Sequence, residues 1–108
     1  MNEKELCNQI VEYILYSGKA WVWRNNAGTI PIQSKGKTRI IKVGQKGEAD
    51  ILGIRKSDGK FIAIEVKLPE RKKLVTEFQK EYLEKVKEYG GLAGVATSCE
   101  EAKEIISQ

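Results

Sequence analysis

The sequence predicts an α/β fold in which a mixed β-sheet is flanked by helices, with the element order αβββαβ and then a C-terminal helix. Three observations predict this class. Apolar residues recur at helical spacing near both ends of the chain and over residues 74–89, glycine-punctuated apolar runs fill residues 21–68, and a further apolar run follows at 92–97. With 108 residues, 41% of them hydrophobic, the chain has the size of one domain, 1–108, with one modest core.

The first predicted helix begins at Asn2, because Asn2 and Glu5 have the spacing at which two side chains cap each other's backbone N–H groups. The helical pattern ends at Gly18. Its inner face is predicted to contain Leu6, Ile10, Tyr13 and Ile14.

Short antiparallel strands are predicted at residues 21–23, 29–32, 38–43 and 49–54. The turn Ser57-Asp58-Gly59 then introduces the strongest strand, residues 61–68, which Pro69 ends. Trp21 and Trp23 alternate with Val22, so we expect them in the core or at an interface rather than as platforms for nucleic-acid bases.

A long helix is predicted from about residue 74 to 89, closed by Gly90-Gly91, and a short strand follows at 92–97. Ser98 and Glu101 predict a capping box for the terminal helix, whose apolar face contains Ala102, Ile105 and Ile106. The long helix is expected to turn Phe78, Tyr82, Leu83, Val86 and Tyr89 inward.

Composition argues against several kinds of chemistry. The chain has no histidine, which removes His-activated nucleophiles, and Cys7 and Cys99 lie far apart without the spacing of a structural zinc site. Both cysteines are expected to be reduced and buried. Nothing resembles a signal peptide or membrane span, and we expect a cytoplasmic protein without membrane contact.

The net charge of +4 is concentrated in one stretch. From Arg24 to Gly47 there is no Asp or Glu, whereas six basic residues occur there. Such a segment suits a polyanion, although a solvated basic hairpin would have the same composition.

Glu65 and Lys67 are predicted to share one face of the strongest strand, because side chains alternate along a strand. A simple ion pair at the strand end is one interpretation. Asp50 opens another apolar strand fifteen residues earlier, and the intervening turn would bring the Asp50 and Glu65 carboxylates within range of one divalent cation. A simple strand-entry role for Asp50 is the other interpretation, and Glu48 is a rival ligand.

Asp50 followed by Ile64-Glu65-Val66-Lys67 resembles the signature of the PD-(D/E)XK nuclease superfamily. Residues 24–28, 47–50, 64–67 and 76–79 together are similar to its VRR-NUC branch, in particular to small stand-alone members from bacteria and phages. Ala49 stands where the superfamily carries proline. The resemblance covers nearly the whole chain and implies a restriction-endonuclease-like fold.

By this resemblance, Asp50 and Glu65 bind Mg²⁺ or Mn²⁺ with the backbone carbonyl of Val66 as a further ligand. Lys67 would orient or activate the attacking water, and the reaction would be phosphodiester hydrolysis without a small-molecule cofactor. Whether one or two metal ions take part is left open.

The branch also carries a glutamate on its first helix and a glutamine on the helix after the metal-binding strand, and Glu5 and Gln79 match these positions. Glu5 would reach the metal or its water, but it is also placed to cap Asn2, and Glu3 is a rival. Gln79 is likewise placed to form a capping box with Thr76.

Four residues are expected to contact the DNA backbone. Arg24 and Asn25 lie at the end of a predicted strand, and Lys42 and Lys46 precede the acidic motif.

The expected function is a metal-dependent DNA endonuclease that acts on structured or branched DNA, such as four-way junctions. A homodimer is implied because stand-alone members of the branch tend to form one. The alternative is a non-catalytic nucleic-acid-binding module of a larger phage or mobile-element complex. RNA cleavage or a restriction-like activity on the same core is a third hypothesis.

Overall fold

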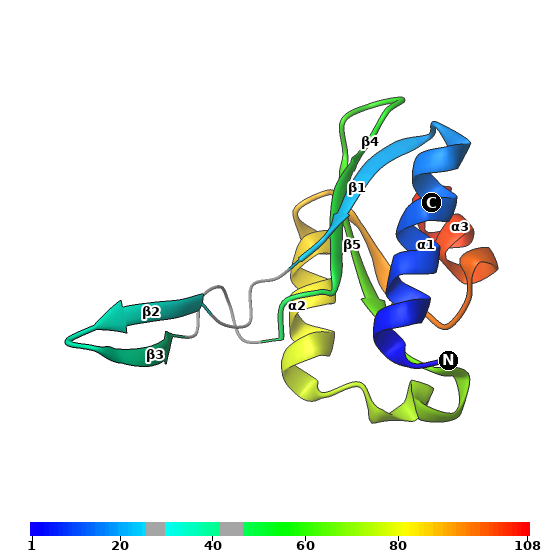
Figure 1. The fold of residues 1–108 in the computed structure, drawn as a ribbon. Helices are drawn as coiled ribbons and strands as arrows, with labels where there is room; N and C mark the ends of the chain where they lie inside the picture. Colours follow the sequence, from blue (N-terminus) through cyan, green and yellow to red (C-terminus); the bar gives the residue numbers. More distant parts are fainter. Residues whose placement is uncertain (26–29, 42–46) are drawn as a thin grey trace.

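The computed structural model describes residues 1–25, 30–41 and 47–108. A mixed four-stranded sheet lies at its centre, with helices on both faces (Figure 1). Its elements are α1 (Glu3–Ser17), β1 (Ala20–Arg24), β2 (Ile30–Ser34), β3 (Lys37–Ile41), β4 (Ile51–Arg55), β5 (Phe61–Val66), the 3-10 helix η1 (Pro69–Leu74), α2 (Glu77–Glu88), β6 (Leu92–Ala96) and α3 (Cys99–Ile106).

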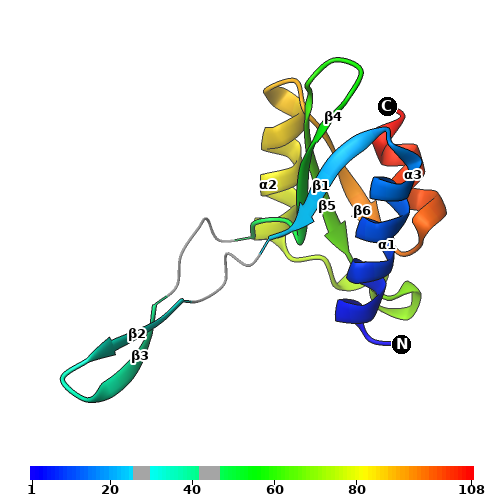
Figure 2. The ribbon, with the colours of Figure 1, turned by 45° about the horizontal axis from the view of Figure 1, so that its top comes forward.

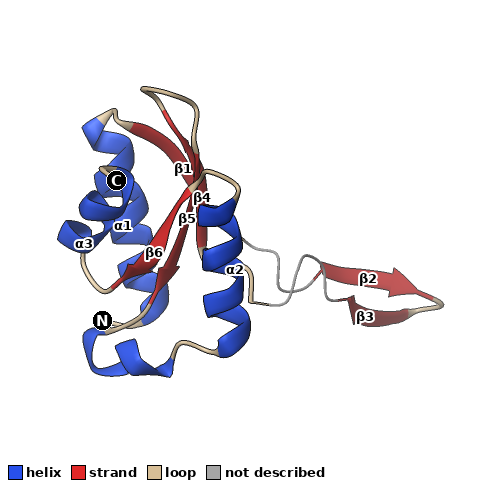
Figure 3. Ribbon diagram, turned by 180° about the vertical axis from the view of Figure 1, so that it is seen from behind, coloured by secondary structure: helices blue, strands red, loops and turns tan. Residues whose placement is uncertain are grey.

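The central sheet has the strand order β1-β4-β5-β6. Strand β4 pairs antiparallel with both β1 and β5, whereas β6 is parallel to β5. Figure 3 shows α1 and α3 on one face of this sheet and α2 on the other. The expected mixed sheet flanked by helices is therefore confirmed.

Strands β2 and β3 form a separate two-stranded sheet. They pair as a hairpin that stands away from the central sheet (Figure 2). The turn consists of Lys35 and Gly36, with φ angles of 51° and 74°. Two positive φ values in a two-residue loop are typical of the turn that matches the twist of hairpin strands. The three strands before α2 in the central sheet are thus β1, β4 and β5.

The main core lies between the central sheet and helices α1 and α3. Strand β5 runs through the middle of the sheet, and its residues 62–66 are buried on both faces, which explains their nearly continuous apolar character. The predicted inward residues of α1 and α3 are buried there, except that Tyr13 is exposed. Cys7 is buried as expected, whereas Cys99 is only half-buried.

Helix α2 begins three residues later than the sequence pattern suggests. Residues 69–74 form η1, and Thr76 then caps α2: the Gln79 N–H donates to the Thr76 hydroxyl, and the Thr76 N–H donates to Gln79 Oε1. The expected inward position of Tyr89 is wrong, because α2 ends at Glu88 and Tyr89 is 81% exposed. Phe78, also expected inside, is exposed as well.

The predicted capping box of α3 is half correct. The Glu101 N–H donates to Ser98 Oγ, but the Glu101 carboxylate accepts from the Thr97 N–H at 2.7 Å instead of capping Ser98. Its other oxygen pairs with Lys72 at 2.9 Å. Hydrogen bonds from Thr97 and Lys72 lower the pKa of Glu101 to about 2. Glu101 therefore links η1 to the start of α3.

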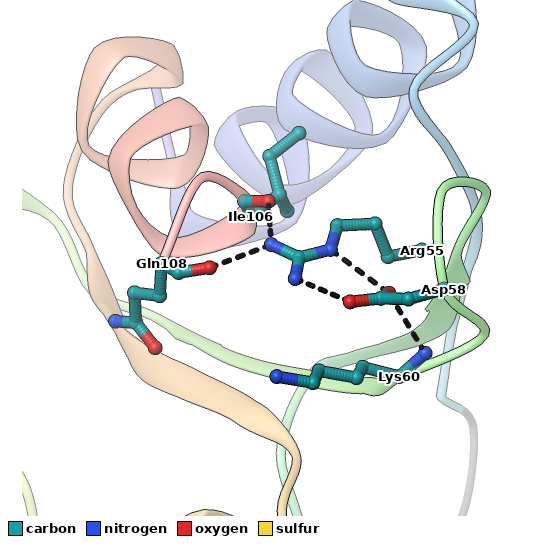
Figure 4. Close-up of polar contacts among 5 residues, drawn as sticks. All are labelled: Arg55, Asp58, Lys60, Ile106 and Gln108. Carbon is teal, nitrogen blue, oxygen red and sulfur yellow. Dashed lines mark hydrogen bonds and ion pairs between the residues drawn. The ribbon is translucent and has the colours of Figure 1, made fainter.

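An arginine joins the β4–β5 hairpin to the end of α3 (Figure 4). The Arg55 guanidinium pairs with both oxygens of Asp58, at 3.0 and 2.6 Å. It also donates to the backbone carbonyls of Ile106 and Gln108, at 3.0 and 2.7 Å. One planar group thus fixes the turn and the helix end together.

Replacing Arg55 by glutamine is expected to lower the melting temperature, because it removes the ion pair with Asp58 and the donor to the Ile106 and Gln108 carbonyls at and beyond the end of α3. Thermal unfolding followed by circular dichroism measures the change. Lys80→Gln is the matched control, since its ion pair with Glu77 joins two exposed side chains on one helix and should contribute little. Equal melting temperatures for the two variants would contradict the proposed role of Arg55.

Within the described residues, no helix has the length and apolar character needed to cross a membrane.

Candidate active site

Asp50 and Glu65 meet where β4 begins and β5 ends. The antiparallel register pairs Ile51 with Ile64, so Asp50 and Glu65 lie one step beyond this pair. Asp50 Oδ2 accepts a hydrogen bond from the Val66 N–H at 2.8 Å. The hairpin predicted from the sequence therefore brings the two carboxylates together.

The Glu65 side chain is deeply buried, because only 2% of the residue's surface is exposed. Its Oε1 accepts from Gln79 Nε2 at 2.8 Å and lies 3.9 Å from Lys67 Nζ. Among the described residues, Glu65 Oε2 is the one buried side-chain oxygen or nitrogen without a hydrogen-bond partner. In the ionised carboxylate such a buried oxygen without a donor is costly, and either a proton shared with Asp50 or a cation would compensate for it.

The electrostatics of the pair favour either a bound proton or a bound cation. Burial, the negative charge of Asp50 and a carboxyl–carboxyl hydrogen bond together raise the pKa of Glu65 to about 9, and the Lys67 charge opposes them. Without a metal ion, Glu65 is therefore protonated at neutral pH. A divalent cation would replace that proton, because metal ligation requires the carboxylate form.

Gln79 has two roles at once. Its Oε1 accepts from the Thr76 N–H at 2.8 Å and completes the capping box of α2, while its Nε2 donates to Glu65. The two interpretations of the sequence are thus compatible, since one end of the amide serves the helix and the other the buried carboxyl group.

Gln79→Glu separates these two roles, because a carboxylate keeps the capping acceptor but cannot donate to Glu65. We expect a folded protein whose divalent-metal affinity is lower by about 10- to 100-fold, the usual effect of removing a group that orients a metal ligand. Calorimetric titration with Mn²⁺ measures this affinity. Unchanged Mn²⁺ binding in this variant would show that the Gln79–Glu65 contact does not support a metal site.

A cleft of about 170 Å³ opens beside Asp50 and is lined by Glu3, Lys4, Cys7, Arg24, Asn25 and Asp50. Glu3, rather than Glu5, therefore lies on the cleft. The Glu5 carboxylate accepts from the Asn2 N–H and is exposed, which is the capping role that the sequence also allowed.

Cys7 was not recognised from the sequence as part of this region. Burial raises the pKa of its thiol to about 11, the Asp50 charge acts in the same direction, and a nearby Arg24 opposes them. The thiol is therefore neutral at physiological pH and is a poor nucleophile. A cysteine in the apolar pattern of a helix gives no sequence signal of such a position.

Of the four residues expected to bind DNA, one lines the cleft, one makes hydrogen bonds to the loop before β4, and two lie outside the described residues. Arg24 ends β1, which confirms its predicted place at a strand end, and it lines the cleft, whereas its contact with DNA stays a prediction. Asn25 holds the loop before β4, because its N–H donates to the Asp50 carbonyl at 2.8 Å and its Nδ2 donates to the Ala49 carbonyl at 3.1 Å. Lys42 and Lys46 lie outside the described residues.

Gly47 allows the loop before β4 to pack closely against the first turn of α2. Its φ is +80°, and a Cβ there would overlap the Phe78 carbonyl group and lie 2.8 Å from the Gln79 nitrogen. Only glycine fits both conditions. The loop that carries Asp50 thus packs directly on the turn of α2 that carries Gln79.

The oxygen donors of Asp50 and Glu65 fit a hard divalent cation. Among the described residues, no group of three or more Asp, Glu, Cys or His side chains is arranged to hold a metal. Two carboxylates are nevertheless the usual protein share of a Mg²⁺ site, which keeps several waters and completes its coordination with substrate phosphates. The Val66 carbonyl, at the end of β5, is a further candidate oxygen donor.

A comparison of the chain with models of known protein families gives no match, and a comparison with curated proteins gives none either. The function is therefore argued from the geometry of these residues.

Proposed function

We propose that the protein is a Mg²⁺- or Mn²⁺-dependent DNA endonuclease with a restriction-endonuclease-like core, as its resemblance to the VRR-NUC branch implies. The observation that carries this proposal is the pair formed by Asp50 and Glu65, in which a buried carboxyl oxygen has no hydrogen-bond donor. Lys67 and Gln79 are the side chains that contact the same carboxyl group.

Asp50 and Glu65 would hold the metal ion, and the Val66 carbonyl would add a third oxygen. A bound ion would supply charge neutralisation at the scissile phosphate and would lower the pKa of bound water. Gln79 keeps Glu65 in place through its hydrogen bond to Oε1, which leaves Oε2 for the ligand. The Asp50 carboxylate is fixed by the Val66 N–H through Oδ2, which leaves Oδ1.

Lys67 would orient a nucleophilic water and balance the negative charge of the site. Its ammonium group lies 3.9 Å from Glu65 Oε1, and its side chain is largely shielded from solvent. Preorganised positive charge in such a setting stabilises charge that develops in the transition state. Arg24, which lines the cleft beside Asp50, would bind a phosphate of the DNA backbone.

Cleavage assays test the proposal. Wild type and Glu65→Ala are incubated with labelled linear, flapped and four-way DNA in Mg²⁺, in Mn²⁺ and with chelator, and RNA of matched sequence is included. We expect wild type to cut DNA only with metal, with branched substrates preferred, and Glu65→Ala to retain its circular dichroism spectrum without cutting.

Tight DNA binding by wild type without any cleavage product would favour a non-catalytic binding module. Sedimentation equilibrium tests the homodimer that the resemblance implies, and a monomer at all concentrations would contradict it.

A further inference from the structure

Six of the eight aromatic residues lie on the side of the molecule that carries α2, and we call this surface the aromatic face. Its strand residues are Trp21, Trp23 and Phe61, Phe78 and Tyr82 belong to α2, and Tyr89 directly follows that helix. Trp21 is 67% exposed and Phe78 is 47% exposed. Exposed aromatic side chains gathered in this way mark a binding surface more often than a solvated one.

Of the two positions that the sequence predicts for the tryptophans, the core is wrong, whereas the interface stays a prediction. Ala20 and Val22 point from β1 into the core beneath α1, so Trp21 and Trp23 point to the opposite face. Helix α2 covers that face over β5 and β6, whereas β1 is the strand at the opposite edge of the sheet (Figure 3). The two indole rings therefore lie at the surface with their centroids 5.2 Å apart.

The strand register connects the aromatic face to the candidate active site. Trp21 pairs with Ile54, which pairs with Phe61, and this forms the first transverse row across the sheet. Trp23 and Leu52 belong to the second row. Asn25, Asp50 and Glu65 form the third, because the Asn25 N–H donates to the Asp50 carbonyl. Successive rows on one face are about 7 Å apart.

Lysines lie at two places beside the aromatic residues, and Glu48 is the acidic residue whose charge acts on Tyr82. Lys85 lines a groove of about 340 Å³ together with Phe61, Tyr82 and Tyr89. At the far end of β1 and β4, Lys56 and Lys19 are joined by a backbone hydrogen bond, and both side chains are exposed. The acidic residue of that end, Asp58, is paired with Arg55.

We propose that the aromatic face binds the bases of single-stranded DNA and guides the strand toward the candidate active site. This inference rests on the proposed nuclease function. It implies that the DNA substrate contains a segment of unpaired nucleotides. Aromatic rings stack on bases of any sequence while lysines contact the phosphates. Bases paired inside a duplex are not available for such stacking, so the surface selects unpaired nucleotides. A two-fold dimer through the same face would bring the lysines of both copies into one interface.

Intrinsic fluorescence tests the proposal directly, because Trp21 and Trp23 are the only tryptophans of the chain. The full protein is titrated with short oligo(dT) in chelator, so that binding is measured without cleavage. The matched control is an abasic oligomer with the same phosphates but no bases. We expect oligo(dT) to quench the fluorescence at saturation and the abasic oligomer to leave it nearly unchanged.

Alanine variants identify the residues responsible. Trp21→Ala and Trp23→Ala should each weaken oligo(dT) binding by about 5- to 150-fold, the effect of losing one stacking platform. Tyr16→Ala is the control, since Tyr16 is 95% exposed on α1, across the sheet from the aromatic face. If either tryptophan variant fails to fold, Phe61→Ala tests the same surface, with binding followed by fluorescence anisotropy of labelled oligo(dT).

Two results would overturn the proposal. One is equal quenching by oligo(dT) and the abasic oligomer, which would mean that only phosphates are bound. The other is no quenching by either oligomer together with an emission maximum that shifts to shorter wavelength as protein concentration rises, which would assign the face to a contact between copies. Metal-dependent cleavage alongside either result would leave the nuclease function standing, whereas quenching without cleavage on any substrate would refute the nuclease function alone.

Discussion

Glu65→Gln is expected to abolish metal-dependent cleavage of DNA and, in chelator, to make the folded protein more stable than wild type at alkaline pH. Glutamine keeps an oxygen that accepts from Gln79, and its amide donates to Asp50 without carrying charge. The loss of cleavage follows because a neutral amide is a weak metal ligand.

The pH dependence follows from the direction of the Glu65 pKa shift. The pKa of this carboxyl group is about 9 in the folded protein, whereas its ordinary value is 4.5. Between these values the folded state holds a proton that the unfolded state has lost, so the stability of the metal-free wild type falls as pH rises through this window. Above pH 9 Glu65 has lost its proton in both the folded and the unfolded state, so it adds no further pH dependence to the free energy of unfolding.

Thermal unfolding at a series of pH values checks this prediction. Wild type and Glu65→Gln should unfold at similar temperatures near pH 5, and the variant should become the more stable of the two toward pH 9. Added Mg²⁺ should raise the melting temperature of wild type, since a ligand stabilises the state that binds it, and should leave the variant unchanged. A difference in melting temperature between wild type and Glu65→Gln that stays constant from pH 5 to pH 9 would mean that Glu65 is not protonated in the metal-free protein.

Gly47→Ala is expected to destabilise the fold by about 2–4 kcal/mol, the sum of a strained backbone conformation and an overpacked contact. The added Cβ would overlap the Phe78 carbonyl group, which is backbone and cannot rotate away. Because the same turn of α2 carries Gln79, cleavage should fall as well. Urea unfolding measures the free energy, and cleavage under folding conditions measures the activity.

Gly59→Ala is the matched control for this prediction. Gly59 has a similar φ of +74°, but among the described residues no heavy atom beyond its two chain neighbours lies within 4 Å of the position where its Cβ would be. It should therefore show only the backbone strain, about 1 kcal/mol, and retain full activity. If both variants lose the same free energy of unfolding, the contact between Gly47 and α2 has no role of its own.

Some of the candidate site could be predicted because it depends on local periodicity. Alternation along residues 61–66 places Glu65 on one face, and the short turn at Ser57-Asp58-Gly59 fixes which residue of the preceding strand lies opposite. Asp50 follows from these two rules without knowledge of the remaining fold.

Other features depend on how elements pack, and the sequence does not contain that information locally. Glu3 and Glu5 both belong to the first turn of α1, and the rotation of the helix against the sheet decides that Glu3 lines the cleft. Alternation likewise shows that Trp21 and Trp23 share a face, but only the position of α2 decides that this face is open. The close approach of Gly47 to α2 joins residues about thirty positions apart.

Diffraction at an energy sensitive to Mn²⁺, from crystals of the protein soaked in manganese chloride, tests the proposed metal site most directly. We predict an anomalous peak between Asp50 and Glu65, with metal–oxygen distances of about 2.0–2.2 Å to Glu65 Oε2, an oxygen of Asp50 and the Val66 carbonyl. Bound Mn²⁺ elsewhere, with Glu65 still hydrogen-bonded to Asp50 through a shared proton, would contradict the proposed site.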